Sequence, residues 1–368
     1  MIAAGGTGGH VYPALAVAEA ALQSDPKTEL VFVGSVDGFE RPLVEAGGVS
    51  FLAYHEVQAG PIHGVNVLRA IQSAFLMLLG TGQALALIRR YRPQVVLLTG
   101  GWVGFPVALA AWLSRVPSLI YLPDIEPGLA IRVLRRLATQ VAVTAPESQA
   151  YFPAGQTVVT GYPLRRALMA STRDAAIQHF NLDPTCPTLL VFGGSRGAQT
   201  INSALVDVLP RLLADGVQVI HVAGTLDYER VKQSTASLTA ANAYHLVDYL
   251  HSEQMGLAFA AADVAVCRSG ASVIGEFPYF GLPSVLIPYP FAWRYQKVNA
   301  DYLAERGAAI HLPDEQLNSQ LYPILHGLFT DAPRLVTMKA NVRRLAHPDS
   351  AAHIAKLLAQ LAAGESPL

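Results

Sequence analysis

A histidine beside a run of glycines near the start of the chain could bind a phosphate and move a proton. The run Gly5-Gly6-Thr7-Gly8-Gly9-His10 follows the apolar stretch Met1 to Ala4 and precedes apolar positions at helical spacing. The first turn of a helix has unpaired N–H groups and a partial positive charge, and glycines let an anion approach the backbone closely. The sequence therefore predicts a strand, a phosphate-binding loop and a helix, with His10 as a candidate base or hydrogen-bond partner.

This loop differs from two common nucleotide-binding motifs. The dinucleotide pattern G-x-G-x-x-G would need a glycine at Val11, and the sequence does not supply the Gly-Lys-Ser/Thr of a P-loop. A glycine loop alone is weak evidence for a ligand. A second interpretation of His10, as a histidine that only packs or caps the helix start, therefore stays open at this point.

Another small-residue loop lies between Cys267 and Glu276. It turns a buried-strand pattern into a helical one, so the backbone amides around Gly270 to Ser272 could hold a diphosphate. Glu276, about a turn and a half further along, could offer two oxygens to the vicinal hydroxyls of a ribose. Arg165 could add a bidentate donor to the diphosphate. The ordinary alternatives are a surface ion pair for Arg165 and a solvated helix position for Glu276.

Two carboxylates follow a further predicted strand, in the segment Pro123-Asp124-Ile125-Glu126. Loops at the carboxyl ends of parallel strands line the ligand crevice of an open α/β sheet. Asp124 and Glu126 are therefore second candidates for a general base, after the histidine, although surface acids are commoner than catalytic ones. A third glycine loop, Gly193 to Ala198, places the hydroxyl of Ser195 at the end of another predicted strand.

The elements that position these loops alternate between strand and helix along the whole chain. Buried-strand patterns and helical patterns follow one another, and the series starts again near Thr188. Such alternation is typical of α/β proteins with parallel sheets. We expect two doubly wound, Rossmann-like domains that face each other across a cleft, residues 1–163 and 164–340. Residues 341–368 would form a C-terminal helix and tail that could pack on either domain.

A long amphipathic pattern runs from Val65 to Arg90. It has Arg69 near its start and Arg89-Arg90-Tyr91-Arg92 at its end. A helix with an apolar face and basic edges can lie on an anionic membrane surface. On the pattern alone, a helix that only covers a sheet is the more frequent case. The apolar positions at helical spacing are Val67, Leu68, Ile71, Ala74, Phe75, Leu78 and Leu79.

Composition narrows the possible partners. Hydrophobic residues make up 52% of the 368 residues and charged ones 14%, with a net charge of -1, so a nucleic-acid partner is not expected. Cys186 and Cys267 fit buried free thiols in a reducing cytosol better than a disulfide or a metal site. We expect no signal peptide, no uninterrupted apolar run of membrane-spanning length, and a natural start upstream of the short first strand.

The three glycine loops together carry a specific resemblance. Gly5 to His10, Gly193 to Ala198, and Cys267-Arg268-Ser269-Gly270-Ala271 through Glu276, followed by Gly281-Leu282-Pro283, closely resemble the MurG family. Members of this family are UDP-N-acetylglucosamine transferases that turn lipid I into lipid II in peptidoglycan synthesis, with a two-Rossmann (GT-B) fold. The resemblance reaches to about Asn299. It implies UDP-N-acetylglucosamine and lipid I as substrates, no cofactor and no metal, cell-wall synthesis proteins as partners, and a peripheral place on the cytoplasmic face of the cell membrane.

The resemblance also implies roles for individual residues. Thr7, Gly8 and Gly9 would meet the donor or acceptor diphosphate, with His10 near the reacting groups. Residues 1–163 would form the acceptor and membrane-associating domain, and residues 164–340 the donor-binding domain. The donor contacts would be Arg165 and Ser195, the backbone of Leu250 at the uracil, Ala271, Ser272, Val273, Ile274, Gly275 and Glu276 at the diphosphate and ribose, and Gln296 at the sugar hydroxyls.

Four places depart from the family's pattern. Pro123-Asp124-Ile125-Glu126 replaces a His-Glu-Gln-Asn segment, so the family's asparagine has no assigned counterpart. Trp102 stands in place of a tyrosine, Val273 in place of a threonine, and Tyr295 in place of a glutamine. The departures concern residues that contact the acceptor and the sugar in the family. The resemblance is therefore stronger at the nucleotide contacts.

The implied mechanism is a single inverting displacement. The acceptor 4-hydroxyl would attack C1 of the donor sugar and UDP would leave from the opposite face, with His10 as the first candidate base and Asp124 or Glu126 as the second. We expect the two halves to close and exclude water. Three other functions stay open: a glycolipid transferase with another UDP-sugar or acceptor, a UDP-N-acetylglucosamine 2-epimerase, and a non-catalytic UDP-sugar sensor. An epimerase needs no lipid, so the amphipathic helix argues against it.

Overall fold

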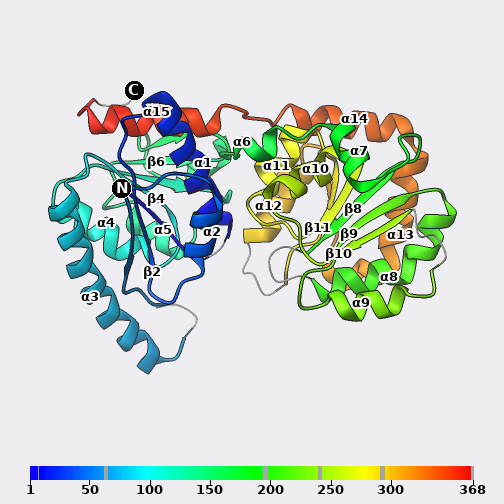
Figure 1. The fold of residues 1–368 in the computed structure, drawn as a ribbon, viewed down its shortest axis with the longest axis horizontal. Helices are drawn as coiled ribbons and strands as arrows, with labels where there is room; N and C mark the ends of the chain where they lie inside the picture. Colours follow the sequence, from blue (N-terminus) through cyan, green and yellow to red (C-terminus); the bar gives the residue numbers. More distant parts are fainter. Residues whose placement is uncertain (7, 62–64, 194–197, 239–242, 291–294, 366–368) are drawn as a thin grey trace. The chain divides into compact units, whose positions relative to one another are not determined.

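The computed structural model describes residues 1–6, 8–61, 65–193, 198–238, 243–290 and 295–365. Within these ranges the chain forms two compact units, which are described separately (Figure 1). Unit 1 contains Met1–Arg165 and the C-terminal segment that begins at His347, and unit 2 contains Arg166–Ala346. Each unit is a parallel sheet covered by helices, so the predicted α/β class with two doubly wound sheets is confirmed.

Unit 1 is built on a seven-stranded sheet in the order β3-β2-β1-β4-β5-β6-β7, and all neighbouring strands run parallel. Strands such as β5, Ser-Leu-Ile-Tyr-Leu, are buried along their whole length because helices pack on both faces. The strand order reverses beside β1, so the carboxyl ends of β1 and β4 form the switch point where such sheets bind ligands. The strands are β1 (Ile2–Ala4), β2 (Val31–Ser35), β3 (Ala53–Val57), β4 (Val96–Gly100), β5 (Ser118–Leu122), β6 (Gln140–Val143) and β7 (Thr157–Val159).

The helices of unit 1 place the first glycine loop directly before a buried helix. Helix α1 follows the loop and packs along α15, the C-terminal helix, which therefore belongs to unit 1 (Figure 1). The side chains from Val11 to Ala18 on α1 are almost all buried. The helices are α1 (Gly8–Ser24), α2 (Glu40–Ala46), α3 (Val67–Tyr91), α4 (Gly104–Leu113), α5 (Leu129–Leu134), the 3-10 helix η1 (Pro146–Tyr151) and α15 (Ser350–Ala362).

Helix α3 is buried on one face and exposed on the other. Asn66 caps its start by accepting a hydrogen bond from the Arg69 N–H, 2.9 Å. Met77, Gly80 and Ala84 lie on the face that packs on α4 and the loop after β3. By length and composition α3, with 25 residues, is long and apolar enough to cross a membrane. Its most apolar 18-residue stretch has a mean hydropathy of 1.6, and 33% of that stretch is buried in the protein.

Unit 2 repeats the architecture with a six-stranded sheet in the order β10-β9-β8-β11-β12-β13, again parallel throughout. Its order reverses between β8 and β11, which sets the second switch point. The strands are β8 (Thr188–Phe192), β9 (Gln218–Val222), β10 (Tyr244–Val247), β11 (Val264–Cys267), β12 (Ser284–Leu286) and β13 (Ala309–His311). The helices are α6 (Arg166–Met169), α7 (Arg173–Phe180), α8 (Gln199–Ala214), α9 (Tyr228–Thr235), α10 (Ser252–Ala261), α11 (Val273–Phe280), α12 (Tyr295–Ala304), the 3-10 helix η2 (Asp314–Gln316), α13 (Leu317–Thr330) and α14 (Ala332–Arg343).

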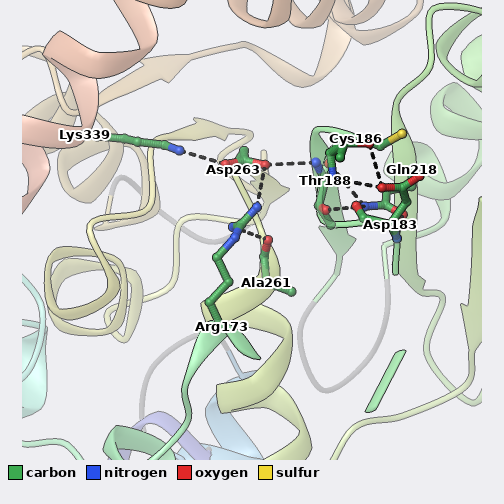
Figure 2. A network of polar contacts seen from close by, with 9 residues as sticks. Arg173, Asp183, Cys186, Thr188, Gln218, Ala261, Asp263 and Lys339 are labelled. Carbon is green, nitrogen blue, oxygen red and sulfur yellow. Dashed lines mark hydrogen bonds and ion pairs between the residues drawn. The ribbon is translucent and has the colours of Figure 1, made fainter. Parts of the chain in front are cut away.

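A polar network closes the amino end of the unit 2 sheet (Figure 2). Asp263, just before β11, accepts from Lys339 Nζ at 2.7 Å, the Thr188 N–H at 3.0 Å and Arg173 Nη2 at 3.4 Å. Burial alone would raise the pKa of Asp263, but these hydrogen bonds and charges outweigh it and hold that pKa below 3.8. Nearby, Gln218 joins β9 to the Asp183 carbonyl and to Thr188. The network ties α7, α14 and two strands at the end opposite the predicted ligand loops.

Candidate active site

Two glycine turns lie against each other at the switch point of unit 1. The Gly5 N–H donates to the Gly100 carbonyl at 3.2 Å, which joins the end of β1 to the end of β4. A Cβ atom at Gly101 would lie 2.9 Å from Gly5 Cα, and Gly101 has φ +82. Both the close approach and the left-handed backbone require glycine at this position. The contact between Gly100-Gly101 and the first loop was not predicted from the sequence.

These turns hold His10 in one orientation. Its Nδ1 lies 2.8 Å from the Gly5 carbonyl oxygen. Because a carbonyl can only accept, Nδ1 donates, and neutral His10 keeps its lone pair on Nε2. The ring lies against Gly100, where a Cβ would come within 2.7 Å of Nε2, and Thr99 Oγ1 donates to the His10 carbonyl at 2.7 Å. The half-buried imidazole is thus held by the Gly5 carbonyl and packs against Gly100.

Glu40 lies beneath the same loop, almost completely buried at 1% exposure. Its Oε1 accepts from the Gly6 N–H at 3.2 Å and from Ser35 Oγ at 3.0 Å. A Cβ at Gly5 would collide with that oxygen. Sequence reasoning missed Glu40, because an acid in the first turn of a short helix is normally solvated. The one available signal was its position shortly after the carboxyl end of a predicted strand.

The two candidate carboxylates after β5 have different surroundings. Glu126 is buried at 4% exposure and accepts from Arg132 Nη2 at 2.7 Å, while Arg132 Nε also donates to the Pro127 carbonyl at 3.0 Å. This ion pair gives Glu126 a role in holding the loop. Asp124 is half-buried and lies directly at the carboxyl end of the strand.

Arg165 lies at the end of unit 1 and contacts α1. Its guanidinium carbon is 3.9 Å from the centroid of the Tyr12 ring, close enough for a cation–π interaction. Gly8 and Gly9 form the start of α1 and are partly exposed, so their N–H groups belong to the first turn of that helix. Thr7 and Ser195 lie outside the described residues.

In unit 2 a partly buried arginine organises the loop after β11. The Arg268 side chain is 11% exposed and pairs with Asp314. Its Nη1 also contacts the Ile287 and Pro288 carbonyls, each at 3.3 Å, and Nη2 donates to Thr200 Oγ1 at 2.8 Å. Arg268 therefore joins the ends of β11 and β12 to the starts of η2 and α8. Arg268 is part of the motif Cys267 through Glu276, but no role was predicted for it from the sequence.

Helix α12 is bound to the same loop. Ser269 Oγ donates to the Gln296 carbonyl at 2.7 Å, and Asn299 Nδ2 donates to the Ser269 carbonyl at 3.2 Å. The Gln296 side chain accepts from the Tyr289 N–H at 2.8 Å through Oε1. These contacts bring Gln296 next to the β11 loop.

The backbone N–H groups at the start of α11 differ in whether they are bonded within the helix. The N–H groups of Val273, Ile274 and Gly275 donate to the carbonyls three residues before them, at 3.0 to 3.2 Å. The side chains of Val273 and Ile274 are buried. An amide site for a diphosphate would therefore consist of the N–H groups of residues 270–272. A Cβ at Gly270 would meet nothing within 4 Å, so this glycine borders open space. Glu276 is partly exposed in the first turn of α11.

Leu250 lines a pocket of ≈ 830 Å³ beside the edge strand β10. Asp248, Tyr249 and Gln254 share this lining, so the pocket extends along the loop from β10 into α10. Within the described ranges, no group of three His, Cys, Asp or Glu residues could hold a metal ion. Cys186 and Cys267 are both free thiols.

Comparison with known proteins gives matches in both halves of the chain. Residues 1–143 match the glycosyltransferase family 28 N-terminal domain, and residues 188–354 match the glycosyltransferase family 28 C-terminal domain. A relative from Roseiflexus sp. (strain RS-1) is 40% identical, over 97% of this chain and 93% of its own. One from Desulforudis audaxviator is 37% identical over 98% of both chains. Both are named UDP-N-acetylglucosamine--N-acetylmuramyl-(pentapeptide) pyrophosphoryl-undecaprenol N-acetylglucosamine transferase.

Solved structures show the same arrangement of elements. The crystal structure of Acinetobacter baumannii MurG matches with a TM-score of 0.76 and 28% identity, over 98% of both chains. A UDP-N-acetylglucosamine 2-epimerase matches with a TM-score of 0.70, but at 13% identity this likeness concerns the fold alone.

Proposed function

The chain belongs to glycosyltransferase family 28 and to the MurG family within it, and we propose that it catalyses the reaction for which its relatives are named. In that reaction N-acetylglucosamine passes from UDP-N-acetylglucosamine to the 4-hydroxyl of the muramoyl sugar in lipid I, giving lipid II for peptidoglycan synthesis. The relatives match over nearly their whole length, so both halves of a two-substrate enzyme are represented.

The reaction is a displacement at one carbon atom. The oxygen of the acceptor 4-hydroxyl forms a bond to C1 of N-acetylglucosamine, the bond from C1 to the UDP oxygen breaks, and the configuration at C1 inverts. The hydroxyl proton passes to a base, and the leaving UDP takes the electron pair of the broken bond. The protein must therefore supply a proton acceptor on one side and stabilise a diphosphate on the other.

His10 is the base in this proposal, and its hydrogen bond to Gly5 is the observation that carries the assignment. In this proposal Nδ1 donates to the Gly5 carbonyl, and Nε2 would take the hydroxyl proton. Glu126 is committed to Arg132, which lowers its value as a base, and Asp124 remains the second candidate. Gly8 and Gly9, with Thr7, would contact a diphosphate through the N–H groups at the start of α1.

The donor is held by unit 2 in this proposal. The N–H groups of residues 270–272 and the positive end of α11 would stabilise the diphosphate, and Ser195 would add a hydrogen bond. Arg165, the last residue of unit 1, would be a further hydrogen-bond donor to the diphosphate. Glu276 would accept hydrogen bonds from the ribose hydroxyls, and Gln296 would donate to the sugar. The backbone of Leu250 would contact the uracil, which places the base of the nucleotide beside the pocket at β10.

A polyprenyl acceptor requires the enzyme to work at a membrane surface, and α3 supplies a fitting face. Val67, Leu68, Ile71, Phe75, Leu78 and Leu79 are between 45% and 80% exposed. Arg69 at one end and Arg89 and Arg90 at the other can contact anionic headgroups. Because the opposite face of α3 packs on α4, we propose that the helix lies on the cytoplasmic surface as a peripheral anchor and does not span the bilayer.

Vesicle binding tests the membrane proposal. Replacing Phe75 and Leu78 by aspartate should weaken binding to vesicles with anionic lipids by about 10-fold or more, since each buried side chain contributes roughly 1.5–3 kcal/mol. Turnover of a short-chain, water-soluble acceptor should stay within about twofold of wild type. Val336→Asp, an exposed apolar position on α14, is the matched control. Unchanged vesicle binding of the α3 variant would show that α3 is not the membrane anchor.

The transfer reaction itself tests the function. Labelled sugar is followed from UDP-N-acetylglucosamine to a short-chain lipid I analogue, with UDP-glucose and UDP-galactose in parallel. Product from the N-acetylglucosamine donor alone supports the proposal. Binding of UDP without lipid I product from any donor would keep the nucleotide site and remove the acceptor assignment.

A further inference from the structure

The Gly5–Gly6 peptide group is hydrogen-bonded to a side chain on each side. Its N–H, which belongs to Gly6, donates to Glu40 Oε1 at 3.2 Å. Its carbonyl, which belongs to Gly5, accepts from His10 Nδ1 at 2.8 Å. The C=O of residue 5 and the N–H of residue 6 share one amide bond, so Glu40 and His10 are joined through a single planar group.

Such a chain transmits charge. A carboxylate that accepts from the amide N–H draws positive charge to that end and makes the carbonyl oxygen a stronger acceptor. A stronger acceptor at Nδ1–H fixes the tautomer and raises the basicity of the other ring nitrogen, as carboxylates do for histidines in metal and protease sites. Glu40 thereby favours a proton on Nε2 without touching the imidazole.

The surroundings fix Glu40 in this position. Its side chain is buried, Ser35 Oγ donates to the same Oε1 at 3.0 Å, and a Cβ at either Gly5 or Gly38 would collide with the carboxyl oxygens. Among the described residues, none forms a hydrogen bond with Oε2. Both glycines therefore leave space for a carboxylate that reaches the loop from α2, 34 residues further along the chain.

We propose that Glu40 is a positioning residue for His10, which acts through the Gly5–Gly6 peptide to hold the Nδ1–H tautomer and to strengthen Nε2 as a base. The inference rests on the proposed function, in which His10 takes the acceptor proton. Arg165, which stacks on Tyr12 of α1, is a second charged side chain near the start of this helix and stays unchanged in every variant below.

Glu40→Gln tests this role, because the amide keeps the size of the side chain and can still accept from the Gly6 N–H. We expect kcat to fall about 5- to 20-fold, with KM for the donor within about twofold of wild type. The acidic limb of the kcat–pH profile should move to lower pH by about 0.5 to 1 unit, because the lost negative charge no longer favours the imidazolium. Glu45→Gln, on the same helix and exposed beside Arg41, is the matched control and should change neither quantity. A lower kcat with an unmoved pH profile would reduce Glu40 to a purely structural residue.

Nitrogen NMR of labelled histidine separates this inference from the proposed function. In wild type, His10 should show the Nδ1–H tautomer, and in Glu40→Gln its titration should move to lower pH even without substrate. If the titration moves but His10→Ala keeps full activity, the Glu40 linkage stands and the base assignment fails. If His10→Ala is inactive but the titration does not move, the base assignment stands and the Glu40 linkage fails.

A wild-type measurement covers the case in which Glu40→Gln does not fold. The Gly6 amide proton should change its chemical shift as His10 titrates, since both groups are bonded to one peptide unit. The Gly101 amide, which lies beside the same loop, is the comparison signal. A Gly6 signal that does not respond to the His10 titration would overturn the proposal.

Discussion

The two ligand loops are held by side chains of opposite charge. In unit 1 the turn after β1 is held by a buried carboxylate, Glu40, which takes up the Gly6 N–H. In unit 2 the turn after β11 is held by a partly buried guanidinium, Arg268, which donates to carbonyl oxygens and to a carboxylate. A carboxylate takes up backbone N–H groups of its loop, whereas a guanidinium takes up carbonyl oxygens and leaves the backbone N–H groups of its loop for an anion.

The glycines of the two loops differ in the same way. Gly5, Gly100 and Gly101 are required by contacts within the protein, because a Cβ at any of them would meet Glu40, His10 or the other turn. Gly270 borders open space. We infer that the first loop is glycine-rich in order to build the support of His10, and the second in order to leave room for a diphosphate.

The largest effect is expected at the base. His10→Ala should lower kcat by about 10² to 10⁴, because proton transfer in the transition state is lost, while UDP affinity stays within about twofold. Steady-state kinetics and calorimetric titration with UDP measure the two quantities. His353→Ala, an exposed histidine on α15 of the same unit, is the control. Turnover at the wild-type rate would remove His10 from the chemistry.

At the proposed ribose contact, Glu276, the expected loss is in UDP affinity and not in kcat. Glu276→Ala should weaken UDP binding by about 150-fold, since two charge-assisted hydrogen bonds are lost, each contributing roughly 1.5 kcal/mol. At saturating donor, kcat should change less than fivefold. Glu229→Ala is the matched control, because Glu229 also lies in the first turn of a helix, α9. UDP affinity equal to wild type would refute the ribose contact.

The helices and strands could be predicted from the sequence better than the charged side chains that hold the loops. Strand and helix patterns placed the loops at the carboxyl ends of β1, β5 and β11, because period and turn residues are local signals. The edge strands β3 and β13 carry weak local signals, since each is short, partly exposed and defined by pairing to its neighbour. Glu40 and Arg268 were missed as supports because their partners lie 34 and 46 residues away in sequence. A charged residue shows its burial only once the fold brings those partners together.

A glycine pair sharpens the comparison between the loops. Gly5→Ala should lower the free energy of unfolding of unit 1 by about 1–3 kcal/mol, because its Cβ meets Glu40 and lies 3.0 Å from Ser35 Oγ. Gly270→Ala should change that free energy by less than about 0.5 kcal/mol, yet weaken UDP binding severalfold. Chemical denaturation and UDP titration of both variants measure this. Equal losses of stability would contradict the different origins of the two glycines.

The smallest effect on activity is expected at the amino end of the unit 2 sheet. Asp263→Asn should lower the free energy of unfolding at pH 7 by about 1–2 kcal/mol and leave UDP affinity unchanged. Because the pKa of Asp263 is lowered from 3.8, its contribution is present above that pH and is lost as the pH falls further. Wild type and variant should therefore converge towards pH 2 in urea unfolding. Asp174→Asn, exposed on α7, is the control, and a difference that persisted at pH 2 would contradict the linkage.

The central claim is that unit 1 supplies the proton acceptor and unit 2 holds the donor, as two independent contributions to one transition state. The double variant His10→Ala/Glu276→Ala tests it most directly through kcat/KM for the donor. Independent contributions predict a loss equal to the product of the two single losses, within about twofold. A loss no greater than that of the worse single variant would contradict the division, because it would mean that the two residues act on the same step as one unit.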